Sequence, residues 1–267
     1  MEDPVDVFDR RAVRLHRDRA AASVEQVGDI LRGCAERLLD RLDDTHQRFV
    51  RALDIGGRGV VAPMLGARGY EVVSTDLSPS MAARNHGLVV VADEEFLPFA
   101  PASFDLAVAS LSLHWVNDLP GVLIQLRRVL RPGGLLLASL PVLGTLAELR
   151  RALTEAEAAL TAGAAPRVSP FPELQDCASL MLRAGYTGAV ADVEELRLLY
   201  ADPLRLLREL RAAGEANAVR LREKRIPPRA LFPMALAALE QGEGGRIAAT
   251  LRLAVMTGWA PVPAGGG

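Results

Sequence analysis

The sequence predicts an α/β fold: a Rossmann-like, seven-stranded, mostly parallel sheet with helices on both faces. Two observations favour this fold. Between residues 50 and 140, short apolar runs alternate with stretches of helical character, and three of these runs end in an acid. A glycine-rich turn, Gly56-Gly57-Arg58-Gly59, follows the first run and leads into a helix. Strands that alternate with helices favour parallel pairing through right-handed crossovers.

Composition narrows the class of protein. The chain has 267 residues, half of them hydrophobic, which allows one large domain or a core with an appendage. A net charge of −2 and 4% aromatic residues argue against a nucleic-acid binder. Two distant cysteines, Cys34 and Cys177, and four scattered histidines predict neither a disulfide framework nor a metal site. No apolar run is long enough for a membrane span, and the acidic N-terminus does not resemble a signal, so a cytoplasmic location is expected.

Residues 1–48 are expected to form an N-terminal helical lid. A basic run begins near Val7 and contains arginines at 10, 11, 14, 17 and 19, and a second helix is predicted from Val24 to Asp43. The arginines have two interpretations. They form a solvated helix face, or they belong to a lid whose arginine reaches a carboxylate on a ligand or substrate.

The predicted elements of the first half of the sheet follow the alternation directly. Strands are expected to end at Ile55, Asp76, Ala92 and Ala109, with helices over 60–67, 78–84 and 119–130 between or after them, and a fifth strand over 135–140. Ser78 is a plausible N-cap with Pro79 at the first helical position. Pro132-Gly133-Gly134 is expected to stop the preceding helix and turn the chain into the fifth strand.

The second half predicts a helical insertion before the last strand. Helices are expected over 145–160 and from an Asp176 cap to Ala184, with a proline-rich loop over 166–172 between them. A sixth strand is expected over 193–200, followed by a helical insertion over about 201–245. A last strand is expected over 247–257, on the remaining edge of the sheet. The core is therefore predicted to span 49–261, with a disordered tail over 262–267.

Three acids follow successive strands. Asp54 lies in the first strand, and Asp76 and Asp93 come directly after or at the ends of the next two. The carboxyl ends of parallel strands line one edge of a sheet, where ligands bind at the point at which strand order reverses. Glycines let a ligand approach the backbone closely. An acid about 20 residues after the glycine turn suits a ribose hydroxyl pair.

These motifs resemble class I S-adenosylmethionine-dependent methyltransferases over residues 50–257. The resemblance is carried by Leu53–Gly59, Thr75–Ser78, Ala92–Glu95 with Leu97-Pro98-Phe99, and Leu130–Gly134. It implies S-adenosylmethionine as cofactor. It also implies these binding residues: Asp54, Gly56, Gly57 and Gly59 for the methionine moiety, Asp76 and Leu77 for the ribose, Asp93 and the Glu94 backbone for the adenine, and Ser110. Arg58 and Val60 depart from the pattern and are expected to crowd the amino-acid end.

A narrower resemblance covers nearly the whole chain. Segments such as Val7–Arg10, Ser112–Gly121 and Thr257–Pro261 are similar to bacterial relatives of mitochondrial complex I assembly factor 5. The same region is similar, less closely, to the malonyl-carrier-protein O-methyltransferases of biotin synthesis. The assembly factor combines a methyltransferase fold with arginine hydroxylation on an iron–sulfur subunit, so the resemblance implies both reactions as alternatives.

The segment Ser110–Trp115 follows a strand end and is expected to face the reacting sulfonium. Methyl transfer mainly requires alignment of two reactants. His114, with Trp115 beside it, could take a proton from a nucleophile. The alternative is that both side chains pack the loop against the lid. The segment has no Asn-Pro-Pro-aromatic tetrapeptide, which argues against methylation of an amide or a base amino group.

Hydroxylation would need an oxygen-activating centre, and no two-histidine, one-carboxylate set can be assembled from this sequence. Arg167 and the segment Val168–Phe171 are interpreted as a partner-binding loop or a plain surface loop. The sequence thus predicts a cytoplasmic S-adenosylmethionine-dependent methyltransferase acting on a protein or carrier-bound substrate, with a link to complex I assembly. The alternatives are a protein arginine hydroxylase and a non-catalytic assembly chaperone.

Overall fold

The fold is built on one seven-stranded sheet with the strand order β3-β2-β1-β4-β5-β7-β6. The computed structural model describes residues 6–161, 163 and 165–263. The strands are β1 Arg51–Ile55, β2 Glu71–Asp76, β3 Leu88–Val91, β4 Phe104–Ser110, β5 Leu130–Pro141, β6 Thr187–Tyr200 and β7 Ile247–Trp259. Strands β1 to β5 pair in parallel, whereas β7 is antiparallel to both β5 and β6. The predicted mostly parallel α/β sheet is confirmed.

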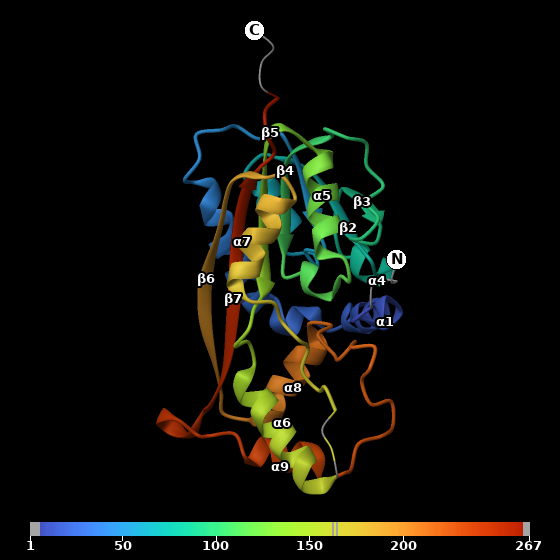
Figure 1. The fold of residues 1–267 in the computed structure, drawn as a ribbon, viewed down its shortest axis with the longest axis vertical. Helices are drawn as coiled ribbons and strands as arrows, with labels where there is room; N and C mark the ends of the chain where they lie inside the picture. Colours follow the sequence, from blue (N-terminus) through green and yellow to red (C-terminus); the bar gives the residue numbers. More distant parts are fainter. Residues whose placement is uncertain (1–5, 162, 164, 264–267) are drawn as a thin grey trace.

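Helices cover both faces of the sheet (Figure 1). They are α1 Arg10–Ala20, α2 Gly28–Leu39, α3 Val61–Ala67, α4 Pro79–Ala82, α5 Leu119–Val129, α6 Ala147–Leu160, α7 Leu174–Arg183, α8 Pro203–Ala212 and α9 Leu231–Ala237. On one face, α5 packs against β5 and α7 packs against β6 and β7, and their core includes Leu53, Leu126 and Met181. On the other face, α2 and α3 pack through Leu38 and Leu65.

The two-sided cover follows from the handedness of the crossovers. The chain runs outward from β1 to β3 and then returns to β4 on the other side of β1. Right-handed crossovers in opposite directions place their helices on opposite faces. Every residue of the central strand β4 is therefore buried, which fits its continuous apolar character.

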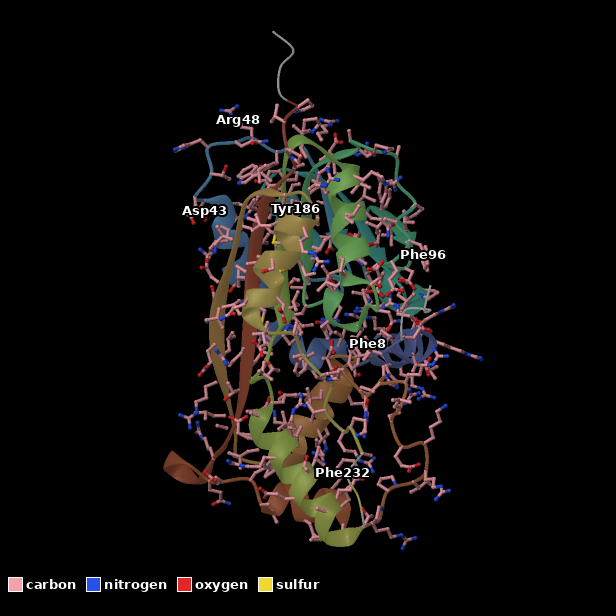
Figure 2. All side chains as sticks on the ribbon, in the orientation of Figure 1. Phe8, Asp43, Arg48, Phe96, Tyr186 and Phe232 are labelled. Carbon is pink, nitrogen blue, oxygen red and sulfur yellow. The ribbon has the colours of Figure 1, made fainter. Side chains whose placement is uncertain are left out.

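The helices α6, α8 and α9 form a separate layer beyond the carboxyl edge of the sheet, and α1 lies at that edge (Figure 1). The layer has its own core, with Leu153, Leu206 and Leu231 packed against the ends of β6 and β7. Phe8, in the segment before α1, lies at the junction of the layers (Figure 2) and packs edge-on against Trp115, with ring centroids 5.2 Å apart. The lid and the insertion therefore meet over the edge where ligands were expected.

Several predicted boundaries need correction. The last strand does not take the remaining edge: β7 lies between β5 and β6, and β6 is the edge strand, which begins at Thr187 rather than at 193. The backbone of β7 is therefore paired on both edges, and most of its apolar side chains are buried. Strand β5 begins at Leu130, because the segment through Gly133 forms an irregularity within the strand instead of a turn before it.

The helix ends also differ in detail. Ser78 caps α4 as predicted, with its Oγ accepting from the Met81 N–H, but α4 ends at Ala82. Asp176 is the third residue of α7 and forms a capping box with the N-cap Glu173. The predicted helix over 24–43 is divided into 3-10 turns around α2. The predicted tail lies mostly outside the described residues. No helix in the described part of the chain is both long and apolar enough to cross a bilayer.

Candidate functional site

The glycine turn after β1 lies at the switch point between β1 and β4. Gly56 has a φ of +63°, a conformation that favours glycine. A Cβ on Gly57 would stand 2.2 Å from the Asp54 Oδ1, and one on Gly56 would stand 2.8 Å from the Ser112 Cβ. Only glycine fits at these two positions. The turn therefore brings the backbone against the Asp54 carboxylate and the loop after β4.

Asp54 is a buried carboxylate that lacks a partner. Its exposed fraction is 0%, and among the described residues neither carboxylate oxygen has a hydrogen-bond partner. Burial, and then the neighbouring carboxylate of Asp76, raise the pKa of Asp54 to about 7. They outweigh the nearby Ser74 hydroxyl and the N–H groups of Ala62 and Gly57, which lower this pKa without forming hydrogen bonds of good geometry. A buried, unsatisfied carboxylate is costly in a folded chain. The position is suited to a cationic ligand group that would pair with it.

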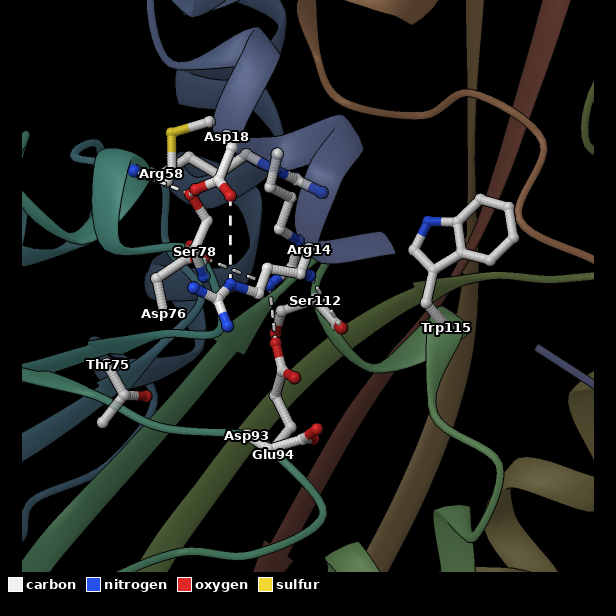
Figure 3. A network of polar contacts seen from close by, with 12 residues as sticks. Arg14, Asp18, Arg58, Thr75, Asp76, Ser78, Asp93, Glu94, Ser112 and Trp115 are labelled. Carbon is white, nitrogen blue, oxygen red and sulfur yellow. Dashed lines mark hydrogen bonds and ion pairs between the residues drawn. The ribbon is translucent and has the colours of Figure 1, made fainter. Parts of the chain in front are cut away.

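A buried ion cluster joins α1 to the ends of β2 and β3 (Figure 3). The Arg17 guanidinium is 1% exposed and lies 2.6 Å from Glu94 Oε1 and 3.5 Å from Asp76 Oδ1. Burial works against ionisation of Glu94, but Arg17 and Arg10 lower its pKa to about 2. Asp76 keeps one oxygen, Oδ2, without a partner among the described residues. The acids predicted at the strand tips therefore do converge, with arginines of the lid between them.

Arg10 holds the third acid. It donates to Asp93 at 2.5 Å, to Glu94, and to the Trp115 carbonyl at 3.0 Å. The side chain of Glu94, for which only a backbone role was predicted, is thus the buried centre of the cluster. The sequence contained a signal for the two arginines, because residues 10 and 17 share one helical face with the buried Val13. Arg11, Arg14 and Arg19 are exposed, as the interpretation of a solvated helix face expects. Arg10 and Arg17 reach carboxylates of the chain itself, and a contact of an arginine with a ligand carboxylate stays a prediction.

Arg58, which was expected to crowd the amino-acid end of the cofactor, is buried and reaches the insertion. Its φ is +52°, and its side chain forms an ion pair with Glu215, which follows α8 in the insertion. Val60 packs into the core beside α2 and α3. The departure from the glycine pattern therefore binds the insertion to the core, and the buried Arg58 also lies near the charges of Asp76 and Glu94. The expected crowding of the cofactor's amino-acid end stays a prediction.

Glu215 also binds both predicted catalytic side chains. Its Oε2 lies 2.7 Å from His114 Nε2 and accepts from Trp115 Nε1 at 2.7 Å. Burial would raise the pKa of Glu215, but His114 and Arg58 lower it to about 2. Nothing in the sequence indicated Glu215, because the acid stands alone after Gly214 in an irregular part of the insertion.

A cavity of about 170 Å³ lies next to this network. Arg58, His114, Trp115 and Glu215 contribute to its wall. The rest is mainly apolar and comes from the lid, from α6, from α8 and from the ends of β6 and β7, with side chains such as Ile30, Leu149, Leu206 and Leu251. The cavity is thus lined jointly by lid, core and insertion and is open to solvent on one side, and a polar cluster lies at one part of its wall.

The remaining predicted residues lie around this edge. Leu77 packs beside Phe8 and Trp115, and Ser110 ends β4 with 6% exposure. The segment that begins at Arg167 is not a plain surface loop, because Arg167 pairs with Glu157 at 2.5 Å and Val168 is buried in the cavity wall. Its role in binding a partner stays a prediction. Among the described residues, no group of three or more His, Cys, Asp or Glu side chains could hold a metal ion.

The fold and site define a class of protein. The topology with an antiparallel β7, the glycine turn, the unpartnered Asp54 and the free oxygen of Asp76 together suit a ligand with a cationic end and a ribose. This is the architecture of a Rossmann-like methyltransferase. The donor set fits S-adenosylmethionine: Asp54 faces the turn where a cationic amino group would be held, and Asp76 can accept from a hydroxyl.

Comparisons with known proteins agree with a methyltransferase fold. A family model described as a methyltransferase domain matches residues 53–138. The chain is 35% identical over 96% of its length to the arginine-hydroxylase NDUFAF5 of Danio rerio and covers 84% of that protein. It is 32% identical over 96% of its length to a malonyl-[acyl-carrier protein] O-methyltransferase of Xylella fastidiosa (strain M23), of which it covers 89%. The solved structure of YcgJ from Bacillus subtilis aligns with a TM-score of 0.57 at 14% identity, over 84% of this chain and 97% of YcgJ.

The chain belongs to the class I S-adenosylmethionine-dependent methyltransferase superfamily, and within it is similar to both the NDUFAF5 proteins and the malonyl-carrier-protein methyltransferases. Its cofactor is S-adenosylmethionine, which supplies an electrophilic methyl group when bound. The predicted superfamily and cofactor are confirmed. The individual binding residues stay predictions.

Proposed function

We propose that this enzyme transfers a methyl group from S-adenosylmethionine to a substrate carried on a protein. The observation that carries the proposal is Asp54, a fully buried carboxylate without a partner beside a glycine turn that only glycine can form. A sulfonium cofactor with a cationic amino group satisfies such a carboxylate. Asp76 would hold the ribose hydroxyls, while Asp93 and Glu94 would lie on the adenine side.

The partly open cavity supports a substrate that enters from outside the core. Its wall is largely apolar, and it borders His114 and Trp115 in the loop after β4. This arrangement would receive the reacting end of a side chain or acyl group while the rest of the partner stays outside. The malonyl-carrier-protein methyltransferases in the comparison act, by their name, on a carrier-bound group.

Arginine hydroxylation of a protein, linked to respiratory complex I assembly, is the second candidate. It is favoured by 35% identity to the zebrafish arginine-hydroxylase over nearly the whole chain. The third candidate, a non-catalytic chaperone, depends on Arg58 and Val60 closing the site, and the ion pair between Arg58 and Glu215 does not favour it. We keep a cytoplasmic location as part of the proposal.

Two measurements test these candidates. Calorimetric titration with S-adenosylmethionine should give saturable binding that Asp54→Asn removes. Mass spectrometry should then follow two partners after incubation with enzyme and cofactor: a malonyl-loaded carrier protein and an arginine-bearing iron–sulfur subunit. A gain of a methyl group on either partner supports the proposal, and a gain of oxygen alone supports hydroxylation. Absence of cofactor binding by the folded protein contradicts methyl transfer.

A further inference from the structure

Three donors of the core converge on one carboxylate of the insertion. Arg58 from the glycine turn, together with His114 and Trp115 from the loop after β4, all bind Glu215. Helix α8 ends at Ala212, and Gly214, with a φ of +81°, turns the chain back, so that the Glu215 N–H donates to the Leu210 carbonyl at 2.8 Å. A Cβ on Gly214 would stand 3.4 Å from the Arg17 Cα, so α1 packs closely against this turn. The position of Glu215 is thus fixed by both the lid and the insertion.

The contact with Glu215 decides which ring nitrogen of His114 carries a proton. The low pKa of about 2 keeps Glu215 ionised, since His114 and Arg58 outweigh the effect of burial. An ionised carboxylate only accepts hydrogen bonds. At 2.7 Å the Nε2 of His114 must therefore donate, and in a neutral imidazole the lone pair then lies on Nδ1. This Nδ1 is buried and has no partner among the described residues.

An unpartnered ring nitrogen in a buried position is unusual and calls for a physical reason. Several other buried polar atoms without a partner in the described part of the chain lie near the same carboxyl edge: both oxygens of Asp54, the Oδ2 of Asp76 and the Oγ of Ser112, whereas those of Asn85 and Arg127 lie elsewhere. A proton acceptor at Nδ1 accounts for the missing partner of His114, and a packing role for the ring does not.

We propose that Glu215 is a positioning residue, which holds His114 in the tautomer whose Nδ1 accepts a proton from the substrate nucleophile. The inference rests on the proposed methyl transfer and names its substrate class: a nucleophile that carries a proton, such as a hydroxyl, thiol or guanidine. The X–H bond breaks, its proton moves to Nδ1, and the freed electron pair forms the bond to the methyl carbon. The methyl–sulfur bond breaks and leaves a neutral thioether, while Glu215 stabilises the resulting imidazolium.

An ionised carboxylate, such as the free end of a malonyl group, has no proton to give and needs no such base, so methylation of the malonyl-loaded carrier would support the proposed function and contradict this inference. A purely structural role makes a different prediction. If Glu215 only ties the insertion to Arg58, its removal would change stability and leave the tautomer of His114 as it was. The two roles are therefore separable by a measurement on the ring nitrogens.

Nitrogen-15 NMR of the histidine rings provides that measurement. Spectra of the full chain would be recorded at about pH 8.5, above the ordinary imidazole pKa of about 6.5. The chain has four histidines, and His114→Gln identifies the resonance of interest. We expect His114 to carry its proton on Nε2 in the wild-type protein and to lose this preference in Glu215→Ala. Glu209→Ala, which removes another insertion carboxylate bonded to Tyr200 at 2.8 Å, should leave the tautomer unchanged.

The tryptophan indoles report folding in the same samples. There are two tryptophans, and only Trp115 donates to Glu215, so Glu215→Ala should shift the Trp115 indole resonance and leave that of Trp259 in place. A proton on Nδ1 in the wild-type protein overturns the inference without any variant, as does an unchanged His114 tautomer in a folded Glu215→Ala. Calorimetry of the wild-type protein with S-adenosylmethionine is a separate readout. If the protein does not bind the cofactor but His114 has the expected tautomer, the proposed function is contradicted and the positioning role of Glu215 is not.

Discussion

Replacing Asp54 by asparagine should stabilise the cofactor-free protein and abolish cofactor binding. The carboxylate is fully buried and neither oxygen has a partner among the described residues, so its charge is an uncompensated cost in the folded state. Asparagine keeps the size of the side chain and removes the charge. It also removes the anion that the cationic end of the cofactor needs. Stability and binding should therefore change in opposite directions.

The magnitude follows from the pKa. Burial and Asp76 raise the pKa of Asp54 from its ordinary 3.8 to about 7. Because the folded state binds this proton more tightly, the charge penalty is absent below about pH 3.8 and grows as pH rises to 7. At roughly 1.36 kcal/mol per pKa unit, the full penalty is about 4 kcal/mol. It is under about 2 kcal/mol at pH 5, so the gain from Asp54→Asn should increase by about 2–3 kcal/mol between pH 5 and pH 8.

Urea unfolding followed by circular dichroism, at pH 5 and pH 8, measures this difference. A matched control is Asp105→Asn, since Asp105 is also buried but its carboxylate accepts from the backbone N–H groups of Val50 and Arg51 at 2.9–3.1 Å. That variant should be destabilised by about 1 kcal/mol or more, because the backbone donors lose a charged acceptor. Calorimetry with S-adenosylmethionine should show binding for Asp105→Asn and none for Asp54→Asn.

The reasoning would be refuted by a stability change in Asp54→Asn that is the same at both pH values. It would also be refuted if the variant were less stable than the wild-type protein at pH 8. Either result would mean that Asp54 is already paired within the fold, and the site would then have no unpaired anion for the cofactor.

Three further predictions concern the same edge of the sheet. Arg17→Ala should lower the free energy of unfolding by about 3–5 kcal/mol, because it leaves the buried Glu94 with one fewer counter-ion. The control Arg14→Ala, at an exposed position, should change it by less than about 0.5 kcal/mol. Equal urea midpoints for the two variants would contradict the buried pair. Asp76→Ala should weaken S-adenosylmethionine binding by about 1.5–3 kcal/mol in calorimetry through loss of a charge-assisted hydrogen bond, and unchanged affinity would show that the ribose is held elsewhere. The pKa values of Glu94 and Glu215 are about 2, against an ordinary 4.5. Each ionised carboxylate therefore contributes stability above pH 4.5, and this stability is lost as pH falls toward 2. Acid titration of Asp54→Asn in a fixed concentration of urea should show unfolding in this pH range.

Much of the fold could be predicted because its signals are local. The apolar runs at 51–55, 71–76 and 104–110 and the turn at Gly56-Gly57 are patterns of adjacent residues, and the structure contains a strand or turn at each. The Ser78 cap and its Pro79 neighbour are also decided by adjacent residues. The position of β7 could not be predicted in this way. Its alternation of apolar residues suits an edge or an interior antiparallel strand, and pairing with both β5 and β6 depends on residues far away in the chain.

The sequence by itself determined the sheet, the glycine turn and the acids at its carboxyl edge, since backbone sterics and hydrophobic periodicity act over a few residues. Tertiary structure alone decided which charges meet. Arg17 reaches Glu94 across 77 positions, and Glu215 reaches His114 across 101. Such pairs form because a buried charge must find a counter-ion wherever packing brings one near, and packing of the lid and the insertion over the sheet is a property of the whole chain. For this reason Asp54 and His114 could be predicted as site residues from the sequence, and Glu215 could not.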